Sequence, residues 1–284
     1  MAPLAAIPVY YDPRMVADAQ SFSPSASKPI AVIESWSRLG LPLERCPVTP
    51  VTVEELCLAH DRAMVEDILS GRRENGFDNT LESVARSLPF TSGAMLGAAR
   101  KAVENGRVAV APVSGFHHAG PDHCGGYCTF NGLIVAARVL LESGAVGKVG
   151  ILDFDQHYGD GTTDCILKFG LDRQVRHFSD GRHYRSPDQS EMFLGRIPTI
   201  VGEMQDCGVV LYQAGADPHL DDPLGGWLSS EQLAHRDHAV FECAQALGLP
   251  VAWNLAGGYQ DPIENVLAIH DETMRACARI YLAL

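Results

Sequence analysis

Residues 149–162 read VGILDFDQHYGDGT, an apolar run that ends in a cluster of polar and titratable side chains. Three more apolar runs end in the same way: RVAVAPV at 107–113, GVVLYQ at 208–213 and PVAWNL at 250–255. Short, continuously apolar runs are typical of strands that are buried on both faces of a parallel sheet. The carboxyl ends of such strands lie at one edge of the sheet, where ligands bind. We therefore expect the polar residues that follow these four runs to lie close together.

Amphipathic stretches alternate with the apolar runs and predict helices. One of them begins with a capping box formed by Thr52 and Glu55. The predicted helices span residues 52–69, 90–104, 131–142, 231–247 and 262–284. Residues 169–204 predict mainly loops, with one weak strand near Val175. The chain shows no repeat and no linker, so we expect a single α/β domain over residues 1–284, with a central parallel sheet and helices on both faces.

The charge balance of the chain is acidic, because 22 lysine and arginine residues stand against 35 aspartate and glutamate residues, a net charge of −13. This balance argues against nonspecific nucleic-acid binding, which needs a basic surface. It fits a cationic or neutral substrate better. The 46% of hydrophobic and 20% of charged residues are typical of a globular protein and exclude disordered, collagen-like and coiled-coil classes.

The cysteines and the N-terminus indicate a cellular compartment. Eight cysteines are scattered along the chain and no signal peptide precedes them, so we expect reduced thiols in a cytoplasmic protein. No stretch approaches the roughly 20 consecutive apolar residues of a membrane-spanning helix, so no membrane partner is expected. The sequence carries no signal for an oligomeric state.

Three residues that follow the apolar runs form a candidate metal site. Asp155, His157 and Asp217 supply two carboxylates and an imidazole. Three protein ligands that leave a fourth position open are the arrangement of a catalytic zinc, because water or substrate takes the open position. Residues two apart in an extended chain point to the same side, so Asp155 and His157 can bind one ion.

Two histidines and two aspartates are candidates for proton transfer. The adjacent His117 and His118 can serve as general acid and base beside a metal site. Asp153 and Asp160 are available to hold these histidines in one tautomer and to raise their basicity.

A tyrosine completes the set of candidate catalytic residues. Tyr259 follows Gly257 and Gly258, which allow the backbone to turn and to approach a ligand closely. Its phenol can donate a hydrogen bond to a developing oxyanion. The combined set predicts metal-assisted hydrolysis of an amide-like carbonyl.

Four motifs occur in a fixed order: HHA, DFDQHYGDGT, QAGADPHLDDPLGG and AGGY. In this order they resemble the zinc-dependent histone deacetylase family. Its superfamily includes acetylpolyamine amidohydrolases and acetoin-utilisation proteins and shares an arginase-like α/β fold. The resemblance covers about residues 50–284. It implies one zinc ion per chain, bound by Asp155, His157 and Asp217.

The resemblance also implies a role for each catalytic residue. His118 would act as general base and then as general acid, with His117 as its electrostatic partner. Asp160 would stand behind His118 and Asp153 behind His117. Tyr259 would correspond to the tyrosine that polarises the substrate carbonyl.

The residues that the resemblance implies for substrate binding follow the histidine pair and precede the tyrosine. Gly126 falls where a backbone carbonyl accepts the substrate amide hydrogen, and Tyr127 and Tyr184 fall where aromatic rings form the wall of the acyl-lysine tunnel. Gly257 and Gly258 complete the predicted substrate-binding set.

The sequence departs from the family pattern at several places. Tyr158 stands where many members carry a second histidine, no residue matches the arginine of the acetate-exit channel, and the segment 174–195 is short. The resemblance further implies a structural potassium ion near Asp153, Asp155 and His157.

We predict from these residues a zinc-dependent amidohydrolase that removes an acetyl or similar short acyl group from a lysine side chain, a polyamine or a related amine. The substrate would be a small molecule or a peptide. One alternative is a binuclear manganese ureohydrolase of the same fold. It needs a further imidazole, whereas Tyr158 and Gly159 follow His157. The other alternative is a catalytically silent protein that binds acylated amines.

Overall fold

The computed structural model of this protein describes residues 3–282 and contains one parallel β-sheet. The described strands are β1 (Ile7–Tyr10), β2 (Leu43–Cys46), β3 (Val108–Ala111), β4 (Val149–Asp153), β5 (Val175–Ser179), β6 (Val209–Gly215) and β7 (Val251–Ala256). They lie in the order β2-β1-β3-β7-β6-β4-β5, and every neighbouring pair is parallel. The predicted α/β class with a central parallel sheet is therefore confirmed.

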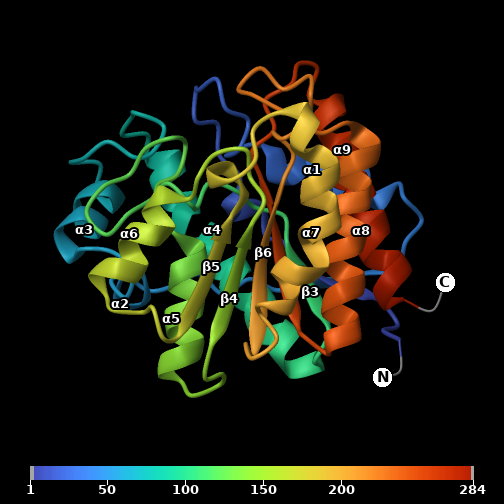
Figure 1. Ribbon diagram of the computed structural model, residues 1–284. Coiled ribbons are helices and arrows are strands. Elements are labelled where there is room, and N and C mark those ends of the chain that lie inside the picture. The colour runs from blue at the N-terminus through green and yellow to red at the C-terminus, as the bar shows by residue number, and fades with distance from the viewer. Residues whose placement is uncertain (1–2, 283–284) are drawn as a thin grey trace.

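Helices cover both faces of this sheet (Figure 1). The described α-helices are α1 (Lys28–Ser37), α2 (Val53–Leu56), α3 (Arg62–Leu69), α4 (Glu82–Asn105), α5 (Gly132–Glu142), α6 (Asp160–Lys168), α7 (Ser190–Gly202), α8 (Ser230–Leu247) and α9 (Glu264–Tyr281). One core cluster joins α1, α7, α8 and α9 to the sheet, and a second joins α3, α4, α5 and α6 to its other face. None of the helices in residues 3–282 is long and apolar enough to cross a membrane.

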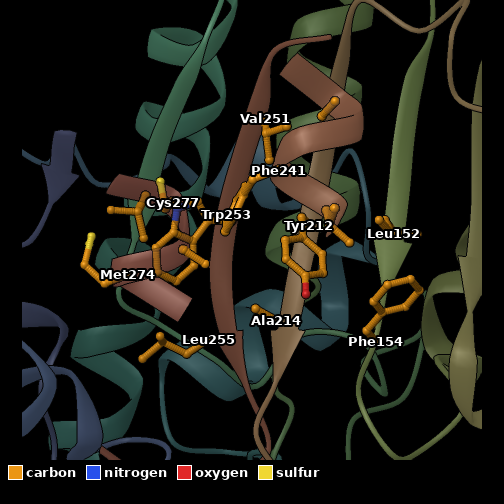
Figure 2. Close-up of a cluster of buried hydrophobic side chains, with 14 of the residues drawn as sticks. Leu152, Phe154, Tyr212, Ala214, Phe241, Val251, Trp253, Leu255, Met274 and Cys277 are labelled. Carbon is orange, nitrogen blue, oxygen red and sulfur yellow. The ribbon is translucent and has the colours of Figure 1, made fainter. Parts of the chain in front are cut away.

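The central strands are buried on both sides, as their continuous apolar sequence predicted. In β6, the side chains of Tyr212 and Ala214 belong to the core that the sheet forms with α8 and α9. Leu211 belongs to the core on the other face, with α4 and α5. Figure 2 shows Tyr212 on the same side as Trp253 of β7 and Phe241 of α8. The rings of Phe241 and Trp253 meet edge to face at 5.9 Å. The two cores fix the sheet from both faces, so the ends of its strands form a rigid base.

The N-terminal part and one later segment differ from the prediction. The helix predicted over 52–69 is divided into α2 and α3, although the capping box of Thr52 and Glu55 is present. His60 lies at the break, where its Nδ1 is 2.8 Å from the carbonyl of Gly120 and its Nε2 accepts a hydrogen bond from Asn131 N. These buried contacts are stronger than the local helical preference.

Within residues 169–204, the strand predicted near Val175 is present as β5. The prediction of loops was wrong for residues 190–202, which form helix α7. Helix α7 buries Phe193, Leu194, Ile197, Ile200 and Val201 at helical spacing. Pro198 within the helix, together with glycines, hid this pattern in the sequence. Strands β1 and β2 and helix α1 were also not predicted, because these elements are short and their hydrophobic periodicity is weak.

A buried polar network joins α8, α9 and β6. Asp237 accepts hydrogen bonds from Arg236 Nε at 2.8 Å and from Thr273 Oγ1 at 2.5 Å, and also from the Tyr212 hydroxyl. Arg236 also donates to the carbonyl of Phe154, the residue directly before the candidate metal ligand Asp155. Both charged side chains are fully buried, so each depends on the other for compensation.

Replacing Asp237 with alanine should lower the free energy of unfolding by about 3–5 kcal/mol, because Arg236 stays buried without its counter-charge. Urea denaturation followed by circular dichroism measures this loss. Asp206→Ala is the matched control, since Asp206 pairs with Lys148 and Arg176 at the surface. Because water screens these exposed pairs, their removal should destabilise the protein far less than the loss of Asp237. Equal, small losses in both variants would contradict the role of the buried pair.

Candidate active site

The four polar clusters meet at the carboxyl edge of the sheet. Strands β3, β7, β6 and β4 are consecutive neighbours, so the loops that follow them start side by side. These loops carry the candidate residues His117, His118, Asp155, His157, Asp217 and Tyr259. Of these, His117, Asp155 and Tyr259 line one cavity together with Gly126 and Tyr127. The predicted convergence of these side chains is therefore present in the fold.

Asp155, His157 and Asp217 lie close enough together to bind one ion. His157 Nδ1 is 3.1 Å from Asp155 Oδ1 and 3.1 Å from Asp217 Oδ2. One potential ligand atom from each residue lies within 4.8 Å of the other two. Two buried carboxylates with one imidazole are a donor set that suits a divalent ion such as Zn²⁺. These three residues therefore fit the metal that the sequence implied.

The two carboxylates of this group are buried beside each other, which is costly without a cation. Burial and the neighbouring Asp155 raise the pKa of Asp217 to about 7. Burial also opposes ionisation of Asp155, but His117 and His157 outweigh it and lower the pKa of Asp155 below its usual range. Hydrogen bonds to Asp155 and Asp217 raise the pKa of His157 to about 11. The group therefore attracts positive charge.

Each histidine of the pair contacts one carboxylate through its Nδ1 atom. His117 Nδ1 is 2.9 Å from Asp153 Oδ2, and His118 Nδ1 is 2.6 Å from Asp160 Oδ1. The ring centroids of the two histidines are 4.1 Å apart. In each pair the imidazole Nδ1–H donates to the carboxylate. The other ring nitrogen of His117, Nε2, lies 3.7 Å from Asp155 Oδ1.

The two histidines differ in their preferred charge. Burial opposes the charged form of His117, but Asp155 and Asp153 outweigh burial and raise its pKa to about 9. Burial and the neighbouring His117 lower the pKa of His118 below its usual value, although Asp160 acts in the opposite direction. His117 is thus suited to carry a positive charge, and His118 is suited to accept a proton.

Asp153 organises the end of β4. Besides its contact with His117, it accepts hydrogen bonds from Gln213 Nε2 at 2.8 Å and from Asp155 N at 3.2 Å. A Cβ atom at Gly159 would lie 2.5 Å from Asp153 Oδ2, so only glycine fits there. The buried carboxylate therefore holds both His117 and the loop that carries the candidate metal ligand Asp155.

Tyr259 is held over the site by its backbone and by a neighbouring ring. Its N–H donates to Asp222 Oδ2 at 2.8 Å, and its ring centroid is 5.8 Å from that of Tyr127. Burial and the carboxylates of Asp155 and Asp217 raise the pKa of Tyr259 far above its ordinary value. The phenol therefore stays protonated and available as a hydrogen-bond donor.

The glycines before Tyr259 are required by the geometry. Gly257 has a φ of +46° and Gly258 a φ of +90°, which L residues rarely adopt. A Cβ atom at Gly257 would lie 2.1 Å from Asp217 Cγ. This turn can therefore pass directly against the candidate metal ligand only because Gly257 has no side chain.

Gly126 and Tyr127 lie at the wall of the site. A Cβ atom at Gly126 would be 2.7 Å from His118 Cδ2. Gly126 and Tyr127 both have positive φ values, +54° and +62°. This backbone conformation places Gly126 against His118 and Tyr127 against Tyr259.

The structure places Tyr184 away from the site, which corrects the prediction that it forms a tunnel wall. Its side chain is 2% exposed and stacks on Trp227 at 5.9 Å, with Phe193 at 5.1 Å. The Tyr184 hydroxyl accepts a hydrogen bond from Arg196 Nη1 at 2.8 Å. The ring packs against Phe193 of α7 within the hydrophobic core, so Tyr184 is a core residue.

Lys28, at the start of α1, also borders the site, although no sequence pattern indicated it. Its side chain is 1% exposed, and its ammonium group donates a hydrogen bond to the carbonyl of Gly257. Burial lowers the pKa of Lys28 to about 8, although Asp217 and Asp155 act to raise it. The two partners are 229 residues apart in the chain, so no local pattern could have indicated this contact.

The described residues contain one group arranged as a metal site. In residues 3–282, Asp155, His157 and Asp217 are the only three histidine, cysteine, aspartate or glutamate residues with this geometry. The imidazole of His117 lies beside this group, with Nε2 3.7 Å from Asp155 Oδ1.

Comparison with known proteins now identifies the family. The histone deacetylase domain matches residues 24–186 of this chain. The chain belongs to the histone deacetylase family. This is a family of deacetylases and amidohydrolases, so deacetylase activity on amides is supported for this chain.

Individual relatives agree with this family assignment. An uncharacterized protein of Picosynechococcus sp. is 30% identical over 217 residues, which are 70% of this chain and 71% of that protein. Histone deacetylase 2 of Arabidopsis thaliana is 27% identical over 213 residues, which are 68% of this chain and 55% of that protein. The crystal structure of an acetylpolyamine aminohydrolase from Burkholderia pseudomallei shares the deacetylase fold, with a TM-score of 0.75 and 16% identity over 97% of this chain and 99% of that one.

Replacing Gly257 with alanine should weaken divalent-ion binding by about 10- to 100-fold, because the added methyl group displaces Asp217. Competition with a chromophoric chelator, using Zn²⁺ as the probe, measures the affinity. Gly106→Ala is the matched control, since Gly106 has a φ of +64° and an added Cβ there would meet no atom within 4 Å. This control should lose only about 1 kcal/mol of stability and keep its ion affinity. Unchanged affinity in Gly257→Ala would show that the turn is not part of the site.

Proposed function

We propose that this protein is a zinc-dependent deacylase that hydrolyses the N-acetyl or short N-acyl amide of an amine. The substrate class is a lysine side chain, a polyamine or a related amine. One observation supports this proposal most strongly. Ligand atoms of Asp155, His157 and Asp217 lie within 4.8 Å of one another, beside two histidines that each contact a carboxylate.

The donor set supports zinc as the ion, with one ion per chain. Two carboxylates and one imidazole leave a coordination position open for a reactant. When bound, the ion supplies a Lewis acid that polarises the substrate carbonyl and makes an attacking water more acidic. The potassium ion implied near Asp153, Asp155 and His157 stays a prediction.

The residues of the chain then carry out proton transfer. His118, which favours its neutral form, takes a proton from the attacking water while Asp160 holds its Nδ1–H. Nearby, His117 favours the charged form and offsets the negative charge that develops at the reacting carbonyl. The protonated His118 then transfers its proton to the departing amine.

Two other groups orient and stabilise the reacting amide. The Tyr259 phenol stays protonated and donates a hydrogen bond to the carbonyl oxygen as that oxygen becomes an oxyanion. We assign the carbonyl of Gly126 as the acceptor for the substrate amide hydrogen. Tyr127 provides an aromatic wall beside Tyr259.

Replacing Tyr259 with phenylalanine should lower kcat on an acetyl-lysine or acetyl-polyamine substrate by about 100- to 1,000-fold, because one donor to the oxyanion is lost. Zinc content should not change. Tyr127→Phe is the matched control, since it removes the hydroxyl of the ring that packs against Tyr259 and should keep activity within about threefold. Undiminished turnover in Tyr259→Phe would count against the proposed mechanism.

Removal of metal by a chelator should abolish amide hydrolysis, and one equivalent of Zn²⁺ per chain should restore it, because the described residues supply ligands for one ion. Metal analysis of the reloaded protein together with a titration of activity measures this stoichiometry. Maximal activity that requires two equivalents of Mn²⁺ would support the ureohydrolase alternative. Binding of a hydroxamate without turnover of any acylated amine would support a silent binding protein.

A further inference from the structure

Four aromatic rings form a continuous row at the candidate active site. Phe22 stacks on Tyr259, with ring centroids 6.1 Å apart and an interplanar angle of 10°. Tyr259 also contacts Tyr127 at 5.8 Å, and Tyr127 contacts Phe77 at 6.1 Å. Phe22 is therefore placed directly against Tyr259, although the two residues lie far apart in the sequence.

Phe22 is also exposed to solvent, which is costly for a large apolar ring. Its exposed fraction is 63%. Among residues 3–282, six other large hydrophobic side chains are exposed, and two of these, Leu220 and Leu224, lie in the loop that follows Asp217. Asp222 of this loop accepts the hydrogen bond from Tyr259 N. Exposed apolar side chains thus occur on both segments that contact the Gly257–Tyr259 turn.

The segment that carries Phe22 is held in place. Ser23 is 4% exposed, and its hydroxyl lies 3.1 Å from that of Ser25, which lines the cavity of the site. At the end of the segment, Lys28 is tied to the carbonyl of Gly257. One face of the Phe22 ring is stacked on Tyr259, and a fixed ring of this kind can bind a ligand with little loss of conformational entropy.

We propose that Phe22 contacts the amine side of the substrate and selects acylated amines with an apolar or aromatic body. This inference rests on the proposed deacylase function. The acylated nitrogen would lie inside the site, and an apolar group on the emerging body would cover the exposed ring of Phe22. Covering this ring removes apolar surface from water and adds ring contacts, both of which favour binding.

The acidic residues Asp221 and Asp222 of the neighbouring loop are not among the residues that line the cavity of His117, Asp155 and Tyr259. Asp222 is 6% exposed, and its carboxylate accepts hydrogen bonds from the backbone of Tyr259 at 2.8 Å and Leu224 at 3.0 Å. It is therefore engaged within the protein. Asp221 is exposed and lines a separate cavity with His219 and Glu272. A polyamine would leave Phe22 and the two leucines without an apolar partner.

Two substrates with the same acylated head separate these classes. The first is Nε-acetyl-lysine whose carboxyl group carries an aromatic amide, and the second is N-acetylputrescine. Phe22→Ala should raise KM for the aromatic substrate about tenfold, because the ring contact is lost, and should change kcat by less than about twofold. KM for N-acetylputrescine should stay within about twofold, and Phe22→Tyr should resemble the wild type on both substrates.

Leu167→Ala is the matched control, because Leu167 is also 63% exposed but lies on α6 and lines a separate surface cavity. It should leave both substrates unaffected. An equal fall of kcat on both substrates in Phe22→Ala would overturn the inference, since Phe22 would then support Tyr259 instead of contacting substrate. Unchanged KM for the aromatic substrate, or a larger rise for N-acetylputrescine, would also overturn it.

A binding measurement distinguishes failure of this inference from failure of the proposed function. Calorimetry on Tyr259→Phe protein, with and without Phe22→Ala, reports affinity for the aromatic substrate independently of turnover. A wild-type protein that hydrolyses neither substrate would refute the deacylase assignment. Weaker binding on loss of Phe22 would still support the contact, and equal binding would refute it.

Discussion

Two carboxylates, Asp155 and Asp217, are buried next to each other after the neighbouring strands β4 and β6, and the site is arranged around this concentration of negative charge. His157 lies 3.1 Å from each of them. His117 and Lys28 lie close to these carboxylates. Asp155 and Asp217 therefore act to raise the pKa of both cationic groups. A divalent ion at the same place would complete this balance, because paired or metal-bound carboxylates tolerate burial.

Close backbone approach is the second condition of this site. Gly257 passes against Asp217, Gly159 against Asp153 and Gly126 against His118, and at each position a Cβ atom would lie within 2.7 Å of the named side chain. The loops can therefore bring candidate catalytic groups from four strands into one small volume. The rigid sheet beneath them fixes these positions, because its strands are packed between two hydrophobic cores.

Much of the central fold could be predicted from periodicity alone. Strand β4 has the predicted bounds, and β3, β6, β7, α5 and α8 lie within a few residues of them. Local sequence failed where tertiary contacts or unusual residues decide the structure. The buried hydrogen bonds of His60 lie where the predicted helix is divided into α2 and α3. Pro198 lies inside α7, and a proline there argues against a helix when the sequence is considered alone. Tyr184, predicted for the substrate wall, is drawn into the core by Trp227 and Phe193.

The sequence by itself determined which chemical groups follow each buried strand, because short continuous apolar runs are typical of buried parallel strands and the carboxyl ends of such strands lie at one edge of the sheet. That was enough to name the metal ligands, the histidine pair and Tyr259 as candidates. Only the tertiary structure decided that Phe22 and Lys28 of the N-terminal segment border the same turn. Contacts between residues more than 200 positions apart depend on how the chain folds back on itself, and such distances leave no periodic pattern in the sequence.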